Sequence, residues 1–365
     1  VTVGYEDGAT MHLGALSAAR EPVLDRRLAR PTRLVCGSGV LHRDAPRDWH
    51  DIPRYPTLTA ALDAVSVAWS ALTGDLGGQV QAEVVQVEDD ATYAGETPTW
   101  PSGPTDTTAA ATCTLSLTLQ AAERQRPTVL VDPNVGWAAP AKPVAYDRLV
   151  VTGLALGGDG WTGLQVPPTR EVRLELSSIL YAENALVFTV PDSGGSVTVD
   201  LCQTAGLRLD GPGELLVVDS IVDAAGAAVI TVPTGSADLT RVSVGGTVTA
   251  RVLFADTVIF DGDVTVEDRF HGCVRYSCAT ADSVLPQSFK VSYDVPLRIV
   301  SRNRRDPAWW RLREDCDPVV SAGAEDGSEL GAFGSVHLAA RLTGFRRRLV
   351  EFTPAGLQTG LIRAD

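Results

Sequence analysis

Hydrophobic and polar positions alternate along most of the chain, and one short version of this alternation returns several times. It runs apolar-x-apolar-x-polar-small-apolar, and residues 215–230 (LLVVDSIVDAAGAAVI) show it clearly. Close variants begin at Leu174 (LELSSILYAENALVFTV) and at Arg251 (RVLFADTVIFDGDVTVED). Because successive side chains of a strand point to opposite faces, this alternation predicts short strands with one buried face.

The spacing of the repeat indicates how these strands are arranged. Ser178, Ser220 and Ser243 mark comparable places, 42 and 23 residues apart, which suggests a repeat of about 21–23 residues. Repeats of this length are typical of solenoids, whose coils bury their apolar side only by stacking on their neighbours. We therefore predict an all-β fold, a right-handed parallel β-helix with capping helices and an irregular C-terminal segment.

Two segments follow the helical period instead, with apolar residues three and four positions apart on one face. The first contains Leu58, Leu62, Val65, Trp69 and Leu72. The second contains Leu338, Leu342, Phe345, Leu349 and Phe352. The first lies where the open strand edges of a solenoid need an N-terminal cap.

The chain divides into three regions by these patterns. We expect residues 1–55 to form an N-terminal β-rich segment, residues 56–290 the β-helix with its cap helix, and residues 291–365 a C-terminal cap or docking segment. Within the β-helix, the Pro-, Thr- and Gly-rich residues 96–112 predict a surface loop.

Composition limits the partners more than it limits the fold. The chain is 44% hydrophobic and 21% charged, as a globular protein is, and its formal net charge is −14. Nucleic-acid binding needs a basic surface, so we expect no nucleic-acid partner. No apolar run is long enough to span a membrane. The first residues resemble no signal peptide, and the missing initiator Met suggests a fragment or a processed chain.

The six cysteines show no metal-binding spacing. They are Cys36, Cys113, Cys202, Cys273, Cys278 and Cys316. Free thiols are the favoured interpretation. In a regular strand, the odd spacing of Cys273 and Cys278 sends them to opposite faces, so we expect no disulfide between these two.

Six motifs follow one another along the chain: PTLTAALDAV, VVQVEDDATYAGE, LTLQAAERQRPTVLV, LLVVDSIVDAAG, FHGCVRYS and GAEDGSELGAF. Over residues 55–360, this order resembles large bacterial β-helix proteins encoded with phage-tail-like contractile injection systems. GCVRYS and GAEDGSELGAF are the most specific elements. The segment CATADSVLPQSFKVSYDV departs from the pattern, since a more Arg-rich segment would be usual.

The resemblance implies a structural part of a larger protein, without catalytic activity or cofactor. It implies other subunits of a phage-tail-like particle as partners, within an oligomeric assembly. With no signal peptide recognised, assembly in the cytoplasm followed by release or display with the particle is favoured.

β-Helices also carry enzymes that cleave polysaccharides, and such enzymes need clustered carboxylates on the outside of adjacent coils. The candidates are Asp219, Asp223, Asp256, Asp261 and Asp263, with Arg241 and Arg251 near them in sequence. Asp261 and Asp263 would share one face of an extended strand, which suits a cation. The sequence Asp-Gly-Asp is also an ordinary turn.

Three further groups have two interpretations each. Glu325, Asp326 and Glu329 loosely resemble a calcium loop, or they begin a helix whose N-terminus favours acidic residues. Trp309 and Trp310 either pack a loop onto the body of the protein or form a surface on which sugars stack. The basic residues Arg341, Arg346, Arg347 and Arg348 are either solvated or contact an acidic neighbour. The two tryptophans together with Arg346, Arg347 and Arg348 make up a candidate docking surface.

Other chemistry is not indicated. The five histidines show no HExxH spacing, and the chain has no nucleotide-binding or nucleophile motif. The sequence therefore predicts no metal and no cofactor. It favours a structural or adhesive particle component that docks through its ends. The alternative is a β-helix protein that binds or cleaves surface glycans.

Overall fold

The structure is a computed structural model. It describes residues 28–37, 49, 51–123, 125–132, 134, 137, 140, 144–158, 161, 164–179, 186–304, 306, 308–313, 315–334 and 351.

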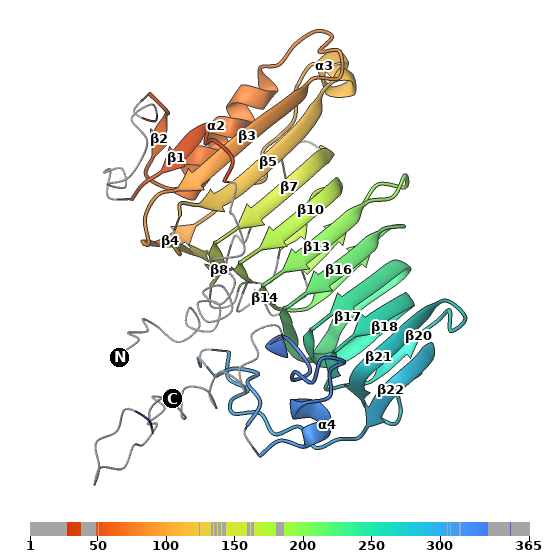
Figure 1. Cartoon of the computed structure of the whole chain (residues 1–365). Helices are drawn as coiled ribbons and strands as arrows, with labels where there is room; N and C mark the ends of the chain where they lie inside the picture. Colours follow the sequence, from red (N-terminus) through yellow and green to blue (C-terminus); the bar gives the residue numbers. More distant parts are fainter. Residues whose placement is uncertain are drawn as a thin grey trace.

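One sheet joins the 22 strands of the described residues, and every pairing between these strands is parallel. The first strands are β1 Arg33–Val35, β2 Arg54–Tyr55, β3 Val80–Val87, β4 Thr92–Glu96, β5 Thr114–Ala121, β6 Thr128–Val131, β7 Tyr146–Thr152, β8 Ala155–Gly157, β9 Gln165–Val166, β10 Thr169–Glu175 and β11 Ser178–Ile179. The others are β12 Leu186–Thr189, β13 Ser196–Asp200, β14 Gln203–Thr204, β15 Leu207–Asp210, β16 Glu214–Val218, β17 Ile221–Thr240, β18 Ser243–Asp256, β19 Ile259–Phe260, β20 Val264–Val266, β21 Gly272–Ala279 and β22 Gln287–Tyr293. The coils stack in a row from β1 at one end to β22 at the other (Figure 1).

Each central coil has three faces. The long strand β17 shows this, because its beginning pairs with β14, its middle with β15 and its end with β16. We number the faces in chain order. β13 and β16 lie on the first face, β14 lies on the second and β15 lies on the third. The predicted all-β solenoid of stacked parallel coils is thereby confirmed.

The inward side of the first face is a continuous apolar ladder. Its rungs are Leu117, Leu149, Val172, Val197, Leu215, Ala237 and Leu253, each in register with the next. All are buried. The recurring motif of the sequence is therefore the rung that each coil adds to this ladder, and each rung is buried by the coils above and below it.

The corner between the first and second faces carries a column of residues with positive φ. They are Leu176, Leu201, Asp219, Arg241, Thr257, Tyr276 and Lys290. A non-glycine residue in this conformation costs about 1–2 kcal/mol. The stack holds the corner through backbone hydrogen bonds from coil to coil, such as Leu201 N to Val218 O at 3.1 Å.

The corner column corrects the predicted repeat length. Successive corner residues are 25, 18, 22, 16, 19 and 14 residues apart, so the coil length is not constant at 21–23. Ser178 and Ser243 do share one column, but three coils apart, and Ile221 rather than Ser220 occupies it between them. Turns of different length separate the strands. They change the number of residues in each coil but leave the ladder residues in register.

The predicted first helix is confirmed as α2 (Leu58–Ser70). The hydroxyl of Thr57 caps it by accepting a hydrogen bond from the backbone N–H of Ala60 at 3.1 Å. The buried carboxylate of Glu96 accepts a second one from the N–H of Thr59 at 2.8 Å. The apolar face of α2 packs into the core. The helix lies at the end of the stack opposite β22 (Figure 1).

Residues 96–112 are more ordered than a surface loop. They end in a short helix, α3 (Thr107–Thr112), capped by Asp106. Trp100 is fully buried, donates a hydrogen bond to Gln165 O at 2.7 Å and packs 4.8 Å from the ring of Trp137. The Pro- and Gly-rich composition misled the prediction, because it could not show that the tryptophan turns inward.

The C-terminal residues pack along the flank of the solenoid. We call residues 309–333 the strap; it includes the short helix α4 (Pro318–Ser321). Its apolar side chains pack against the outer side of the second face, on Leu201, Ile221, Ile259 and Cys278. The strap lies beside β17–β22 (Figure 1). The predicted second helix, residues 338–352, falls outside the described residues apart from Glu351.

All six cysteines are free. Tyr276 bends β21 at the corner, so that Cys273 lies on the first face and Cys278 on the second. No disulfide joins these two, as expected, but the corner at Tyr276 separates them rather than alternation along one regular strand. Burial raises the pKa of the Cys278 thiol to about 12, and it also raises the pKa of Cys202. Both thiols are therefore neutral at ordinary pH.

Candidate functional site

The five predicted carboxylates lie on different parts of the coil. Asp219 occupies the corner and is fully buried. It accepts two hydrogen bonds from Arg241 of the next coil, at 2.6 Å from Nε and 3.0 Å from Nη2. These bonds raise the pKa of Arg241. This bidentate ion pair joins two successive coils.

Asp223 and Asp261 lie on the second face and are held by the C-terminal region. Trp310 donates its indole N–H to Asp223 at 2.8 Å, and Arg304 lies 3.9 Å from the same carboxylate. Arg302 forms an ion pair with Asp261, and its guanidinium lies 5.1 Å from the Trp310 ring centroid. These two carboxylates therefore attach the C-terminal region to the solenoid.

The last two candidates have separate partners. Asp256 points outward on the first face, 2.7 Å from Arg275 Nη2. Asp263 lies in a turn and accepts a hydrogen bond from the hydroxyl of Thr280 at 2.7 Å. The five carboxylates do not converge on one outer face, so the predicted cluster is not assembled in this fold.

The candidate docking surface is also corrected in part. Trp309 and Trp310 are fully buried, because the strap packs both rings against the solenoid. The packing interpretation of this pair is therefore the one that the structure supports. Arg341, Arg346, Arg347 and Arg348 lie outside the described residues.

The acidic loop near the strap's end does not gather its carboxylates. Glu325 and Asp326 are exposed, whereas Glu329 is buried. Asp326 accepts a hydrogen bond from the N–H of Ser328 at 2.9 Å, in a turn completed by Gly327 at φ +77°. Across the described parts of the chain, no three His, Cys, Asp or Glu side chains are grouped so that they could hold a metal ion.

A glycine column shapes the corner between the third and first faces. Asp147, Arg170, Gly195, Gly213 and Gly235 follow one another there from coil to coil. A Cβ on Gly195 would lie 2.6 Å from Arg170 O, and one on Gly235 would lie 2.0 Å from Gly213 O. Only glycine allows this close stacking, and the missing side chains leave the surface hollow beside Arg170.

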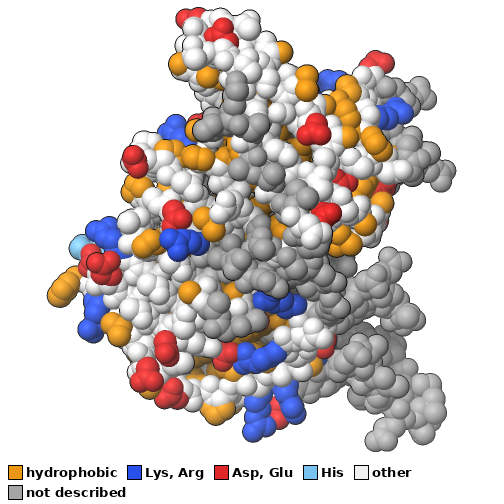
Figure 2. Space-filling model, turned by 180° about the vertical axis from the view of Figure 1, so that it is seen from behind, with side chains coloured by type: hydrophobic (Ala, Val, Ile, Leu, Met, Phe, Trp, Pro, Cys, Tyr) orange, Lys and Arg blue, Asp and Glu red, His pale blue; other side chains and the backbone are white. Residues whose placement is uncertain are grey.

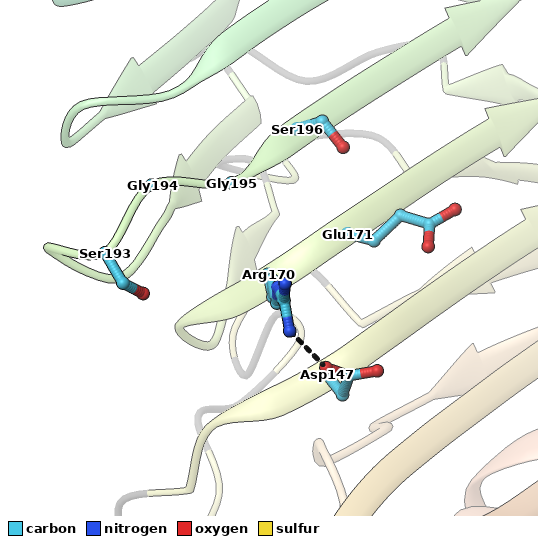
Figure 3. Close-up of a pocket in the computed structure, with 7 residues that line it drawn as sticks. All are labelled: Asp147, Arg170, Glu171, Ser193, Gly194, Gly195 and Ser196. Atoms are coloured by element: carbon cyan, nitrogen blue, oxygen red, sulfur yellow. Dashed lines mark ion pairs between the residues drawn. The ribbon is translucent and has the colours of Figure 1, made fainter.

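This hollow measures about 430 Å³. It is lined by Asp147, Arg170, Glu171, Ser193, Gly194, Gly195 and Ser196 (Figure 3). Arg170 and Asp147 point toward one another, with Nη1 and Oδ1 3.7 Å apart. Exposed ion pairs of this kind are worth about 1 kcal/mol or less. The lining offers hydrogen bonds to a polar ligand but holds no aromatic ring.

A second acidic group, which the sequence did not suggest, lies on the outer first face. Glu214, Asp238 and Asp256 come from three successive coils, on β16, β17 and β18. Burial, followed by the charges of Glu214 and Asp256, raises the pKa of Asp238. In the register, Asp238 lies between Leu216 and Phe254, and the ring of Phe254 is 42% exposed. Only the coil register brings these residues together.

The two ends of the stack differ in how they are covered. Among the described residues, β22 pairs only with β21, so its other edge is open. Phe289 and Tyr293 on β22 are 57% and 47% exposed. The Phe289 ring packs edge-on at 5.7 Å from the Tyr276 ring, and the ammonium of Lys290 lies 5.0 Å from the Tyr276 centroid.

Charges of both signs are interspersed over the surface seen from behind (Figure 2). Among the described helices, none is long and apolar enough to cross a membrane.

The fold places the chain in the class of parallel β-solenoid proteins. Comparison with protein families, with curated proteins and with solved structures finds no match. The resemblance to β-helix proteins of contractile injection systems therefore stays a prediction.

Proposed function

We propose that the chain is a non-catalytic structural subunit of a larger particle, joined to a neighbouring subunit through its last coil. The observation that carries the proposal is the contrast between the two ends of the solenoid. The first coils are covered by α2, whereas no other described strand pairs with the outer edge of β22, which carries exposed aromatic rings. An open parallel edge is a ready template for pairing with another chain.

The placement of the charged side chains supports a mechanical role. Asp219 joins two coils, and Asp223 and Asp261 attach the C-terminal region. These carboxylates contribute to holding the molecule together. The motif resemblance supplies the kind of assembly: a phage-tail-like contractile injection particle. We also expect the coils to wind in the right-handed sense.

The mass of the native complex tests this proposal. The complex should purify as a high-mass particle, with neighbouring subunits identified by mass spectrometry. Phe289→Lys on β22 should reduce incorporation at least several-fold, because charge on an edge strand opposes pairing. Val67→Lys is the matched control, since Val67 is 71% exposed on α2 at the covered end. A free monomer as the native form, or equal incorporation of both variants, would contradict the proposal.

A second candidate function rests on the exposed Phe254 beside Asp238 and Asp256. An aromatic ring next to carboxylates on an outer solenoid face suits stacking and hydrogen bonding of a sugar. Binding to surface polysaccharide should then fall about tenfold or more in Phe254→Ala. Phe270→Ala is the control, because that ring is 98% exposed in a turn. Undetectable binding by the native chain would remove this candidate.

A further inference from the structure

Glu329 is a carboxylate buried without a full set of partners. It lies in the strap, where its side chain is buried to 7% exposure. Its Oε1 makes no hydrogen bond. A buried ionised carboxylate is costly unless hydrogen bonds replace the lost water. Packing of this part of the strap is therefore less costly when the Glu329 carboxyl is protonated than when it is ionised.

The residues that follow Glu329 attach the strap to the solenoid. The backbone N–H of Gly331 donates to Thr257 O at 3.0 Å, and that of Ala332 donates to the hydroxyl of Ser243 at 3.1 Å. The fit is tight, since a Cβ on Gly331 would lie 2.5 Å from Ser243 Oγ. Between Glu329 and Gly331, the backbone N–H of Leu330 donates a hydrogen bond to Val320 O at 2.9 Å, within the strap. Glu329 thus lies only two and three residues before the backbone groups that make the docking contacts.

Arg311 is the charged side chain that acts on the Glu329 carboxyl, and the side chain of Arg241 lies near the backbone of this segment. From the strap, the charge of Arg311 lowers the pKa of Glu329, but burial has the larger effect and raises it from 4.5 to about 7. From the solenoid, the side chain of Arg241 approaches Gly334, which lies against the backbone carbonyl of Glu329. Arg241 is already paired with Asp219. Burial is therefore the larger of the effects on the pKa of Glu329.

We propose that Glu329 makes the docking of the strap sensitive to pH. The strap is held firmly while this carboxyl is protonated, and its hold on the second face weakens when the carboxyl ionises. Acidification closes the strap over Ile221 and Ile259, and mildly alkaline conditions make that apolar flank more accessible.

The direction follows from proton linkage. The docked state binds the Glu329 proton more tightly than the open state, because the docked pKa is about 7 and the reference value is 4.5. The contribution is therefore fully present below about pH 4.5, and it is lost as pH rises through about 7. Between pH 6 and pH 8, the opening equilibrium should increase about tenfold.

Hydrogen exchange of the Gly331 and Ala332 amides measures this opening. We expect the native chain to show the tenfold increase between pH 6 and pH 8, after correction for intrinsic exchange. In Glu329→Gln, which is neutral at every pH, the increase should disappear. Glu325→Gln is the matched control, since it removes an exposed carboxylate from the same loop and should keep the increase.

Two results would overturn the proposal: equal pH dependence in Glu329→Gln and the native chain, or tighter docking at pH 8. If Glu329→Gln does not fold, the carboxyl carbon of Glu329 can be titrated by NMR in the native chain after selective labelling. A midpoint near 7 supports the proposal, and one near 4.5 rejects it.

Discussion

The outer sides of the first and second faces differ, although the inner sides of both are buried and mainly apolar. On the second face, the outward residues Ile221 and Ile259 are apolar and lie under the strap. On the first face, the charged residues Glu214, Asp238 and Asp256 point outward together with Leu216 and Phe254, and no described segment covers them. The inward residues therefore stabilise the coil, whereas the outward residues determine which flank of the solenoid another segment can cover.

The largest effect that tests this comparison concerns one aromatic residue of the strap and one on the open first face. Trp310→Ala should destabilise the protein by about 3–5 kcal/mol, because it opens a cavity under the strap and removes the hydrogen bond to Asp223. Phe254→Ala on the open face should cost less than about 1 kcal/mol. Urea unfolding of both variants measures the difference. Equal losses would mean that the strap contributes little to the fold.

The ion pairs of the corner and the open face should also differ. Asp219→Ala leaves Arg241 without its buried partner, which should cost about 3 kcal/mol. Asp256→Ala breaks a pair whose arginine, Arg275, is 52% exposed, and it should cost less than about 1 kcal/mol. Thermal unfolding at low and at high salt separates the two, since salt screens only the exposed pair appreciably. A salt-sensitive Asp219 pair would contradict its assignment as buried.

The smallest effect concerns the acidic group on the first face. Burial and two neighbouring carboxylates raise the pKa of Asp238, so its ionised form weakens the folded state. That weakening is absent at low pH and develops as pH rises through the ordinary aspartate range. Asp238→Asn should therefore raise stability at pH 7 by less than about 1 kcal/mol and leave it unchanged near pH 3. A loss of stability at pH 7 would show that the charge has a favourable partner.

Much of the coil could be predicted from local pattern. Alternation in LLVVDSIVDAAG identifies a strand, and the spacing of Leu58, Leu62, Val65 and Trp69 identifies α2, because both patterns are set by neighbours in sequence. The candidate sites could not be predicted in this way. Asp219 and Asp223 are four residues apart, yet one joins coils at a corner and the other holds Trp310.

The sequence by itself determined that the chain is built from apolar-stacked strands with a helix near residue 60. Only the tertiary structure decided that the coils differ in length, that Glu214, Asp238 and Asp256 share a face, and that the strap covers the second face. The physical reason is that side-chain alternation belongs to a single strand. Which residue lies above which depends on every turn between them, and on how closely the glycine column lets the coils approach.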